Sequence, residues 1–306
     1  MGPARSAESH AHAQAPHAAR RAVCLARGSV LRLSLLVMIA CSLPSGAAAT
    51  TWPAPITPLT DADRMEYAVS GNALPGLVAV EAVGDSADAD GDVLFWMNVR
   101  PVRWYRGQGP HRPVRIIVSP VAQELYFRVA SWMAEGPVVV VLFALERNGQ
   151  LYARGGPSLP GGGVLRPEPA QLPEIEASIA SAIERTSPEG LERRSDLVLV
   201  GQVLDLDRDC NFEGRVVGCT RVAVDSVLAG KAPSDTIDVH DDYGPLFRRG
   251  PKLLCLRRAG TAYRVVGAAN GMSPIVAGRA EWHGAPISEV ARRIRASRAR
   301  RARGEK

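Results

Sequence analysis

The sequence has few of the residues from which catalytic and metal sites are built. It contains 6 histidines and 5 cysteines in 306 residues, and beyond residue 49 the histidines are His111, His240 and His283. None of these three has a histidine or cysteine neighbour at a spacing typical of metal ligands. A Gly-x-Ser-x-Gly nucleophile motif is also missing. We therefore predict a non-enzymatic protein without a metal or other cofactor.

A hydrophobic run long enough to cross a membrane is missing as well. The apolar stretch 33–43 is shorter than the roughly 20 residues that a spanning helix needs. It follows Arg20, Arg21, Arg27 and Arg32 and precedes the small residues Ala47 to Ala49, which is the layout of a secretory signal peptide. We expect residues 1–49 to be a signal peptide and the protein to be periplasmic or secreted.

The cleavage site has an alternative. Met38-Ile-Ala-Cys41 resembles a bacterial lipobox, in which Cys41 is lipidated and becomes the first residue of an outer-membrane lipoprotein. The first 20 residues are long for a basic leader, so the true start codon could lie further downstream. Membrane contact is expected only through such a lipid or through the basic C-terminus.

Strong positive charge is absent from the body of the chain. The net charge of +6 comes from the leader and from the arginines and lysine between Arg292 and Lys306. The residues between these two segments carry more acidic than basic side chains, which excludes a nucleic-acid-binding surface over the folded body. The basic C-terminus is expected to be solvated, with contact to anionic lipid or an acidic partner as the alternative.

Three cysteines remain beyond the leader. Cys210 and Cys219 flank a short segment between two strand-like runs, so we predict that they form a disulfide in an oxidising compartment. Cys255 aligns with Val141 when Gly250-Pro251 is matched to Gly136-Pro137. A position that accepts valine is a core position, which predicts a buried, inert thiol.

A repeat of domain size supplies the architecture. The strand-like run that begins at Leu77 is echoed by one that begins at Leu197, and a shift of 111 residues carries Tyr152 to Tyr263, Ile179 to Val290 and Ile183 to Ile294. Each copy contains short apolar strands separated by turns, including Asn148-Gly149, and then an apolar stripe of helical spacing after a proline.

The fold class that follows is mostly β, with two tandem small OB-like β-barrels or sandwiches, each closed by a C-terminal α-helix. The expected organisation is a signal peptide at 1–49, a linker with a short helix at 50–75, the first barrel with its closing helix at 76–186, the second at 187–297, and a basic tail at 298–306.

A resemblance supports this fold. The runs Leu197-Val-Leu-Val-Gly-Gln-Val203 and Thr220-Arg-Val-Ala-Val-Asp-Ser-Val-Leu-Ala-Gly230 are similar to bacterial exported proteins whose barrels resemble the tissue inhibitor of metalloproteinase and netrin modules. The resemblance implies an OB-like barrel. It does not imply protease inhibition, because the N-terminal cysteine that reaches the metal in the animal inhibitors has no counterpart at Thr50.

Three aromatic residues of the first copy are candidates for a ligand-binding face: Trp96, Trp104 and Tyr105. Aromatic rings on an OB barrel can stack on sugars or on single-stranded nucleic acid, and export together with the acidic body argues against nucleic acid. The alternative is that these side chains fill the core.

Two further groups of residues resemble active or metal sites. His240 and Asp241 place a base beside a carboxylate, which is the basis for a hydrolase alternative without an identified nucleophile. Alternating aspartates at 85–92 and 205–209 resemble a calcium loop, but an EF-hand register with Gly91 at the sixth position puts Met97 where the bidentate glutamate belongs. A solvated loop is the simpler interpretation.

The sequence therefore predicts an exported, non-catalytic module that binds a protein whose identity it does not reveal. Binding of a carbohydrate or another component of the cell envelope is the second hypothesis.

Overall fold

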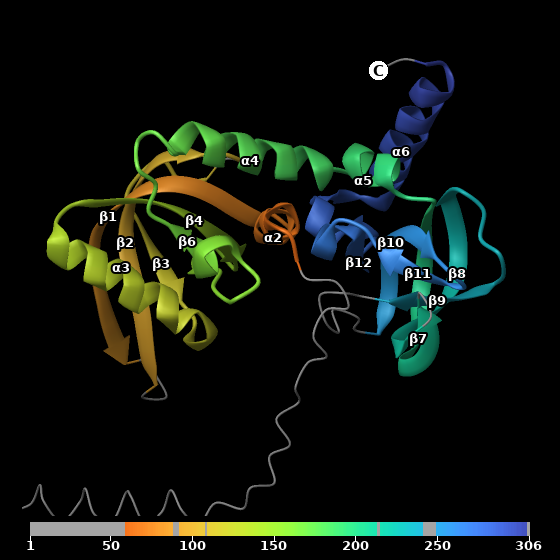
Figure 1. The fold of residues 1–306 in the computed structure, drawn as a ribbon, viewed down its shortest axis with the longest axis horizontal. Helices are drawn as coiled ribbons and strands as arrows, with labels where there is room; N and C mark the ends of the chain where they lie inside the picture. The colour runs from red at the N-terminus through yellow and green to blue at the C-terminus, as the bar shows by residue number, and fades with distance from the viewer. Residues whose placement is uncertain (1–58, 88–91, 108, 213–214, 241–248, 305–306) are drawn as a thin grey trace, which may run out of the picture. The chain divides into compact units, whose positions relative to one another are not determined.

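The computed structural model describes residues 59–87, 92–107, 109–212, 215–240 and 249–304, and residues 53–306 form one compact unit. Both halves of this unit are closed five-stranded barrels, as predicted (Figure 1).

The first barrel has the strand order β1-β2-β3-β5-β4 and closes where β4 pairs with β1. All pairs are antiparallel except β3 with β5, which is the connectivity of an OB-fold. A short strand β6 (Val164–Leu165) adds to β4. The barrel strands are β1 (Ala73–Ala87), β2 (Val93–Trp104), β3 (Val114–Val118), β4 (Val138–Arg147) and β5 (Gln150–Ala153).

Every second side chain of the strands points inward and fills the interior of this barrel. Val78, Met97, Val99, Ile116 and Val140 point inward and are fully buried. Asn148 and Gly149, between β4 and β5, both have positive φ (52° and 76°), so the predicted tight turn is present. The alternation of buried apolar residues and this turn are the features by which the sequence pattern identified the strands.

Helix α3 (Gln123–Glu135) was not predicted. It lies in the connection between β3 and β4, after a short 3-10 turn (Pro120–Ala122). Leu125 and Val129 are buried against the interior cluster, so α3 closes one end of the barrel. Its apolar residues, Leu125, Val129, Trp132 and Met133, have helical spacing, which is the signal that could have identified it.

The second barrel repeats the topology, with order β7-β8-β9-β11-β10, β10 paired with β7, and β9 parallel to β11. Its interior contains Leu199, Val222, Val239 and Leu254. The strands are β7 (Leu197–Phe212), β8 (Arg215–Ala229), β9 (Thr236–His240), β10 (Gly250–Ala259) and β11 (Ala262–Val265), extended beyond β10 by β12 (Met272–Val276), β13 (Arg279–Ala280) and β14 (Ala285–Pro286).

Each barrel has a helix on its outer face at equivalent positions. In α4 (Leu172–Arg185), Ile179 packs with Val141, whereas in α6 (Ile287–Ala302) Val290 packs in one cluster with Cys255. Cys255 is 1% exposed, and burial raises the pKa of its thiol to about 12, as expected for an inert core position. The match of Cys255 with Val141 is therefore confirmed in the packing.

Helix α6 extends into the segment expected to be a tail. It continues through Arg298 to Ala302, so only the last residues follow the helix. Arginine is a good helix former, and the absence of an apolar stripe after Ser297 does not stop the helix. None of the helices in the described part of the chain is long and apolar enough to cross a membrane.

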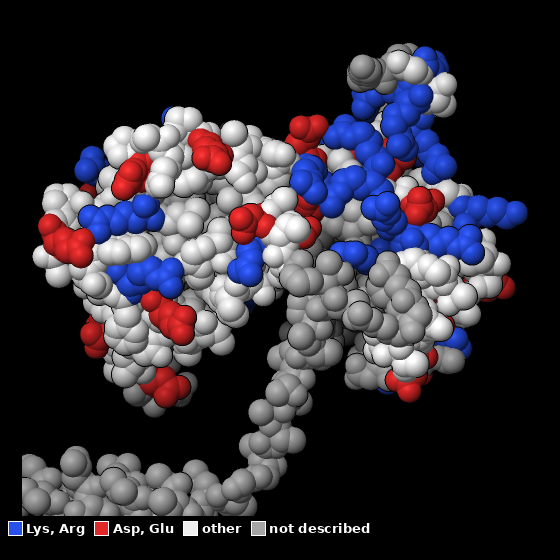
Figure 2. Space-filling model, in the orientation of Figure 1, with Lys and Arg blue, Asp and Glu red and all other residues white. Residues whose placement is uncertain are grey.

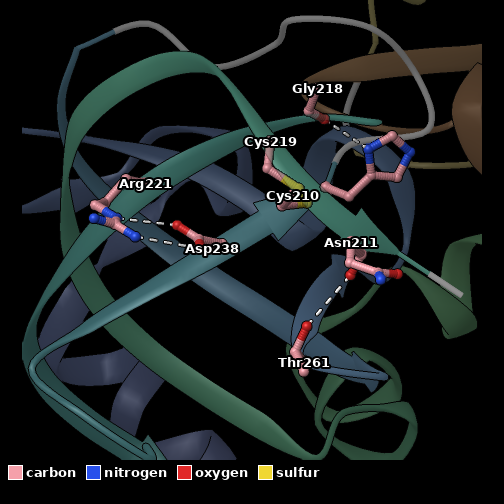
Figure 3. Close-up of a disulfide and its surroundings, with 8 residues drawn as sticks. Cys210, Asn211, Gly218, Cys219, Arg221, Asp238 and Thr261 are labelled. Atoms are coloured by element: carbon pink, nitrogen blue, oxygen red, sulfur yellow. Dashed lines mark hydrogen bonds and ion pairs between the residues drawn. A yellow bond between two sulfur atoms is a disulfide. The ribbon is translucent and has the colours of Figure 1, made fainter. Parts of the chain in front are cut away.

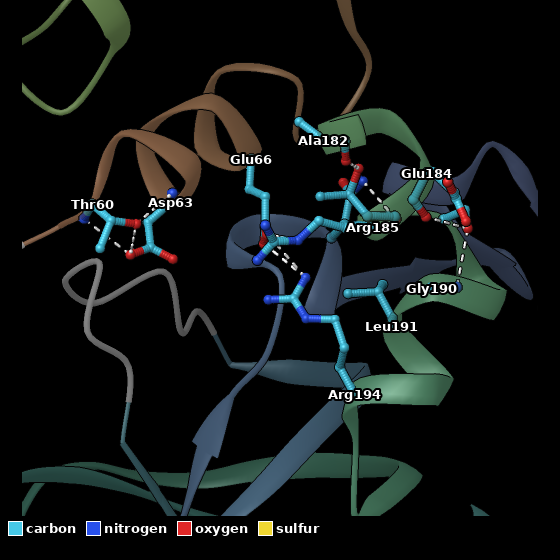
Figure 4. Close-up of polar contacts among 12 residues, drawn as sticks. Thr60, Asp63, Glu66, Ala182, Glu184, Arg185, Gly190, Leu191 and Arg194 are labelled. Atoms are coloured by element: carbon cyan, nitrogen blue, oxygen red, sulfur yellow. Dashed lines mark hydrogen bonds and ion pairs between the residues drawn. The ribbon is translucent and has the colours of Figure 1, made fainter. Parts of the chain in front are cut away.

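Helix α2 (Asp61–Ala68) precedes the first barrel. Thr60 and Asp63 form a capping box, in which each side chain accepts a hydrogen bond from the other residue's backbone N–H (Figure 4). At the other end, Arg154 donates to the carbonyls of Ala68 and Ser70, and Arg106 donates to those of Val69 and Gly71. Two arginines therefore satisfy the carbonyls at and beyond the helix C-terminus.

The buried carboxylate of Glu66 joins α2 to the segment between the repeats. Glu66 is 1% exposed and accepts from Arg185 at the end of α4 (2.7 Å) and from Arg194 in α5 (Pro188–Arg194) at 3.0 Å (Figure 4). A buried carboxylate requires such partners, because desolvating an unpaired charge is costly. The three residues fix the helical connection that leads into the second barrel.

Candidate binding face of the first barrel

The three aromatic residues predicted to form a ligand face lie in different environments. Trp104 packs against the barrel interior, between two glycines: a Cβ atom at Gly76 or Gly109 would lie 2.4 or 2.5 Å from its ring. Its Nε1 donates to the carbonyl of Pro110 (2.9 Å). These contacts hold the partly buried ring of Trp104 against the barrel core.

Tyr105 connects β2 to α4. Its hydroxyl donates to Glu176 (3.0 Å), and the Arg103 guanidinium lies 5.8 Å from the ring centroid. Burial and the neighbouring Glu176 carboxylate raise the pKa of Tyr105 to about 12. The phenol therefore stays protonated and helps to hold α4 on the outer face of the barrel.

Trp96 lies on the outer face of β2 instead. The inward neighbours Met97 and Phe95 contact the core, so alternation turns Trp96 outward. Its ring covers Gly84 of β1, where a Cβ atom would lie 2.4 Å from the ring, and the guanidinium of Arg115 in β3 lies 4.3 Å from its centroid. The result is a flat, partly exposed ring whose orientation is fixed by a glycine and a cation–π contact.

Polar side chains surround this ring. Arg115 donates to Asn98 (3.3 Å) on the same face of β2, and Arg100 pairs with Glu81 (3.0 Å) at the adjoining edge. The Arg100–Glu81 pair is well exposed, so it contributes little to stability. The outer face of strands 2 and 3 is the surface on which OB barrels bind oligosaccharides and oligonucleotides, and Trp96 is its aromatic element here.

A second aromatic group lies where β2 meets α3, and its members Phe95 and Phe127 were not identified from the sequence, because α3 was not predicted. The ring centroid of Phe95 is 4.6 Å from that of Tyr126 and 5.7 Å from that of Phe127, with Tyr126 and Phe127 5.4 Å apart. Phe127 is 54% exposed, and Val93, two residues before Phe95, is 55% exposed. We call Val93, Phe95, Tyr126 and Phe127 the aromatic end of the first barrel.

The predicted disulfide is present in the second barrel. Cys210 in β7 is bonded to Cys219 in β8, across a sequence separation of 9 and a Cα–Cα distance of 5.8 Å (Figure 3). Two residues further along β8, Arg221 pairs with Asp238 of the neighbouring strand β9 (3.0 Å). A disulfide of this kind indicates a compartment outside the reducing cytoplasm.

His240, proposed above as a base, ends β9 beside this disulfide. It is 8% exposed, and its Nδ1 lies 3.0 Å from the Gly218 carbonyl, which requires a proton on Nδ1 (Figure 3). Asp241 lies outside the described residues, as do Asp88, Asp90 and Cys41. Within the described ranges no cluster of three histidine, cysteine or acidic side chains could hold a metal ion.

A hollow of about 340 Å³ is lined by Arg106, Glu146, Asn148, Trp282 and His283, among others. Arg106 already donates to the carbonyls after α2, and Nε2 of His283 donates to the backbone carbonyl of Asn270 (3.0 Å). Burial lowers the pKa of His283 to about 4, so the ring stays neutral at pH 7. These bonds assign Arg106 and His283 to structural roles at the wall of the hollow.

Comparisons with known proteins do not show a family for this chain. No family model matches it, and no curated protein matches it. A chain from a solved structure described as "Molecular basis for abrogation of activation of pro-inflammatory cytokines" is 14% identical, with 65% of this chain and 90% of that chain covered. Its TM-score is 0.19, which is too low to support an argument about fold or function.

Proposed function

We propose that this protein is an exported, non-catalytic module that binds a partner protein through the aromatic end of its first barrel. The observation that carries the proposal is the 54% exposure of Phe127 beside the partly buried ring of Phe95 and the buried ring of Tyr126. Aromatic side chains in ordered surroundings are enriched at the centres of protein interfaces.

The energetic argument concerns the exposed part of the ring. A phenylalanine side chain buries roughly 150–250 Å² when fully covered, so covering the exposed half of Phe127 contributes about 2 kcal/mol. Contacts with Phe95 and Tyr126 hold the ring, which lowers the entropy lost on binding. Val93 extends the apolar surface next to it.

Export is supported by two independent features. One is the signal-like segment 1–49, and the other is the Cys210–Cys219 disulfide. A periplasmic or secreted location follows for cleavage after Ala49, and an outer-membrane lipoprotein for lipidation at Cys41. The mass of the N-terminal peptide of the protein purified from its own cells distinguishes the two, because lipidation adds acyl groups to Cys41.

The test is affinity capture from the protein's own cell envelope with quantitative mass spectrometry. Phe127→Ala is compared with Val216→Ala, which truncates a residue 75% exposed on the second barrel. We expect Phe127→Ala to weaken recovery of a specific partner by about thirty-fold in affinity, as 2 kcal/mol implies, and Val216→Ala to leave it unchanged. Equal recovery by both variants and the wild type would contradict the proposal.

A second candidate function, carbohydrate or envelope binding, is favoured by the position of Trp96. Its ring lies on the outer face of β2 and β3, with Arg115 and Asn98 beside it. A sugar ring can stack on an exposed aromatic ring of this kind, while neighbouring polar side chains form hydrogen bonds with the sugar hydroxyls. Retention on cell-wall and glycan fractions that is lost in Trp96→Ala supports this function. No retention of the wild type on any fraction rejects it.

A further inference from the structure

Helix α6 has two faces of different chemistry. Val290, Ala291 and Ile294 are buried against the second barrel, together with Ser297. The exposed side of the helix carries Arg292, Arg295, Arg298 and Arg300, which we call the outer arginines. Figure 2 shows basic side chains gathered over this helix.

The packing of the helix does not require this charge. Helix α4 occupies the equivalent position on the first barrel, with Ile179 and Ile183 at the places of Val290 and Ile294. On α4 the exposed residue Glu184 stands at the place of Arg295. Because an acidic helix fulfils the same structural role in the other copy, the arginines need an explanation other than folding.

Two further arginines of α6 hold the helix in place. Arg293 donates two hydrogen bonds of 2.7 Å to Glu189 of α5, and Arg301 pairs with Glu192 of α5, which also accepts from Ser297 (3.1 Å). Burial would raise the pKa of Glu189, but the hydrogen bonds and charge of Arg293 hold it below its usual value. The outer arginines, by contrast, form no ion pair with an acidic side chain of the described residues, although the charge of Arg300 also helps to lower the pKa of Glu189.

We propose that the outer arginines form a docking surface for the anionic headgroups of phospholipids. Apart from small alanines, the exposed side of α6 has no apolar residue to insert into a bilayer, so contact with the membrane is electrostatic and peripheral. Ion pairs with α5 hold α6 in place, so its guanidinium groups are presented together to the phosphates of a membrane surface. Guanidinium forms strong, charge-assisted hydrogen bonds with phosphate.

Lipid is favoured over nucleic acid as the source of the phosphates. The outer arginines have no aromatic residue between them on which a base could stack, since the exposed residues from Arg292 to Arg303 are arginine and alanine. Export, as proposed above from the signal-like segment 1–49, also brings the chain to a membrane. This surface lies on the second barrel and does not depend on the partner site proposed for the first.

The experiment measures binding of residues 50–306 to vesicles. This segment contains the compact unit 53–306 and lacks the apolar leader, which would bind lipid by itself. The probes are vesicles of phosphatidylglycerol mixed with phosphatidylcholine, and vesicles of phosphatidylcholine alone. One variant changes the four outer arginines to glutamine, and a control variant changes four exposed arginines elsewhere, namely Arg112, Arg147, Arg249 and Arg257.

Each arginine near an anionic surface contributes about five-fold in partition coefficient, so we expect the α6 variant to lose several hundred-fold and the control variant to lose much less. Binding to phosphatidylcholine alone should be weak, and raising the salt concentration should release the protein from anionic vesicles. Equal binding of the two variants overturns the proposal. Full displacement from vesicles by duplex DNA at equal phosphate concentration also overturns it, in favour of nucleic acid.

Discussion

The two barrels share a topology and differ in the surfaces around it. Both have the same strand order, and in both a helix packs through two aliphatic residues on the outer face of the barrel. The first barrel adds α3 and an exposed aromatic end, whereas the second adds a disulfide and an arginine-rich helix. The shared positions are those that a closed barrel needs, so the unshared positions are where binding functions are to be sought.

The largest expected effect separates two tryptophans of the first barrel. Trp104→Ala removes a ring wedged between Gly76 and Gly109 and should lower the free energy of unfolding by about 3–5 kcal/mol. Trp96→Ala, on the outer face, should lower it by about 1 kcal/mol or less. Denaturant unfolding of both variants measures the difference, and similar values would contradict the packing of Trp104 against the core.

The disulfide should stabilise the second barrel and not the first. Replacing Cys210 and Cys219 together by serine should cost about 2–3 kcal/mol, because the unfolded chain then loses the constraint of a short closed loop. The first repeat, 76–186, contains no cysteine. Hydrogen exchange resolved by peptide should therefore show faster opening of β7 and β8 and little change in β1 and β2; equal acceleration in both barrels would mean that they unfold as one unit.

His283 should make stability depend on pH. Its folded-state pKa of about 4 lies below the ordinary value of 6.5, so the unfolded state binds a proton first as the pH falls. The stabilisation is complete above about pH 6.5 and is lost as the pH falls toward 4, with roughly 2 kcal/mol already lost at pH 5. His283→Gln should flatten this part of the profile, measured by denaturant unfolding at several pH values; an unchanged slope would show that His283 is not the responsible group.

The smallest effect concerns the ion pair that orients α6. Glu189→Gln should cost about 1 kcal/mol at pH 7, because it removes a bidentate pair that is partly exposed. Since the folded-state pKa of Glu189 is lowered, its contribution is present above the unfolded pKa and is lost as the pH falls through the folded value. Thermal unfolding of this variant and the wild type at pH 7 and pH 3 should converge at the lower pH, and a constant difference would contradict this.

The sequence predicted the strands well because alternation and turns are local signals. Asn148-Gly149 identified a hairpin, and the offset of 111 residues placed Ile179 and Ile183 at the positions of Val290 and Ile294. The repeat also predicted the core position of Cys255, in agreement with its place in the apolar run Leu253–Leu256. Comparison of the copies was less helpful for α3, because the connection in the second copy is ten residues shorter and has no room for a helix of this length.

The direction in which the side chains of Trp96 and Trp104 point could not be predicted from their spacing in the sequence. Trp96 and Trp104 are eight residues apart, so an uninterrupted strand would place both on one face. The pairing of Leu77 with Arg103 and of Val78 with Pro101 skips Val102, and this bulge reverses the alternation before Trp104. Trp96 therefore points outward and Trp104 inward, a difference that depends on the pairing with β1 and not on β2 itself.

The most direct test of the central claim, that the unshared aromatic end of the first barrel contacts the partner, is site-specific photo-crosslinking in the native envelope. A photoreactive phenylalanine analogue is placed at position 127 or, as the matched exposed position on the other barrel, at position 216. We predict a discrete crosslinked adduct from position 127 and none of the same mass from position 216. No adduct from position 127, or the same adduct from both positions, would contradict the account.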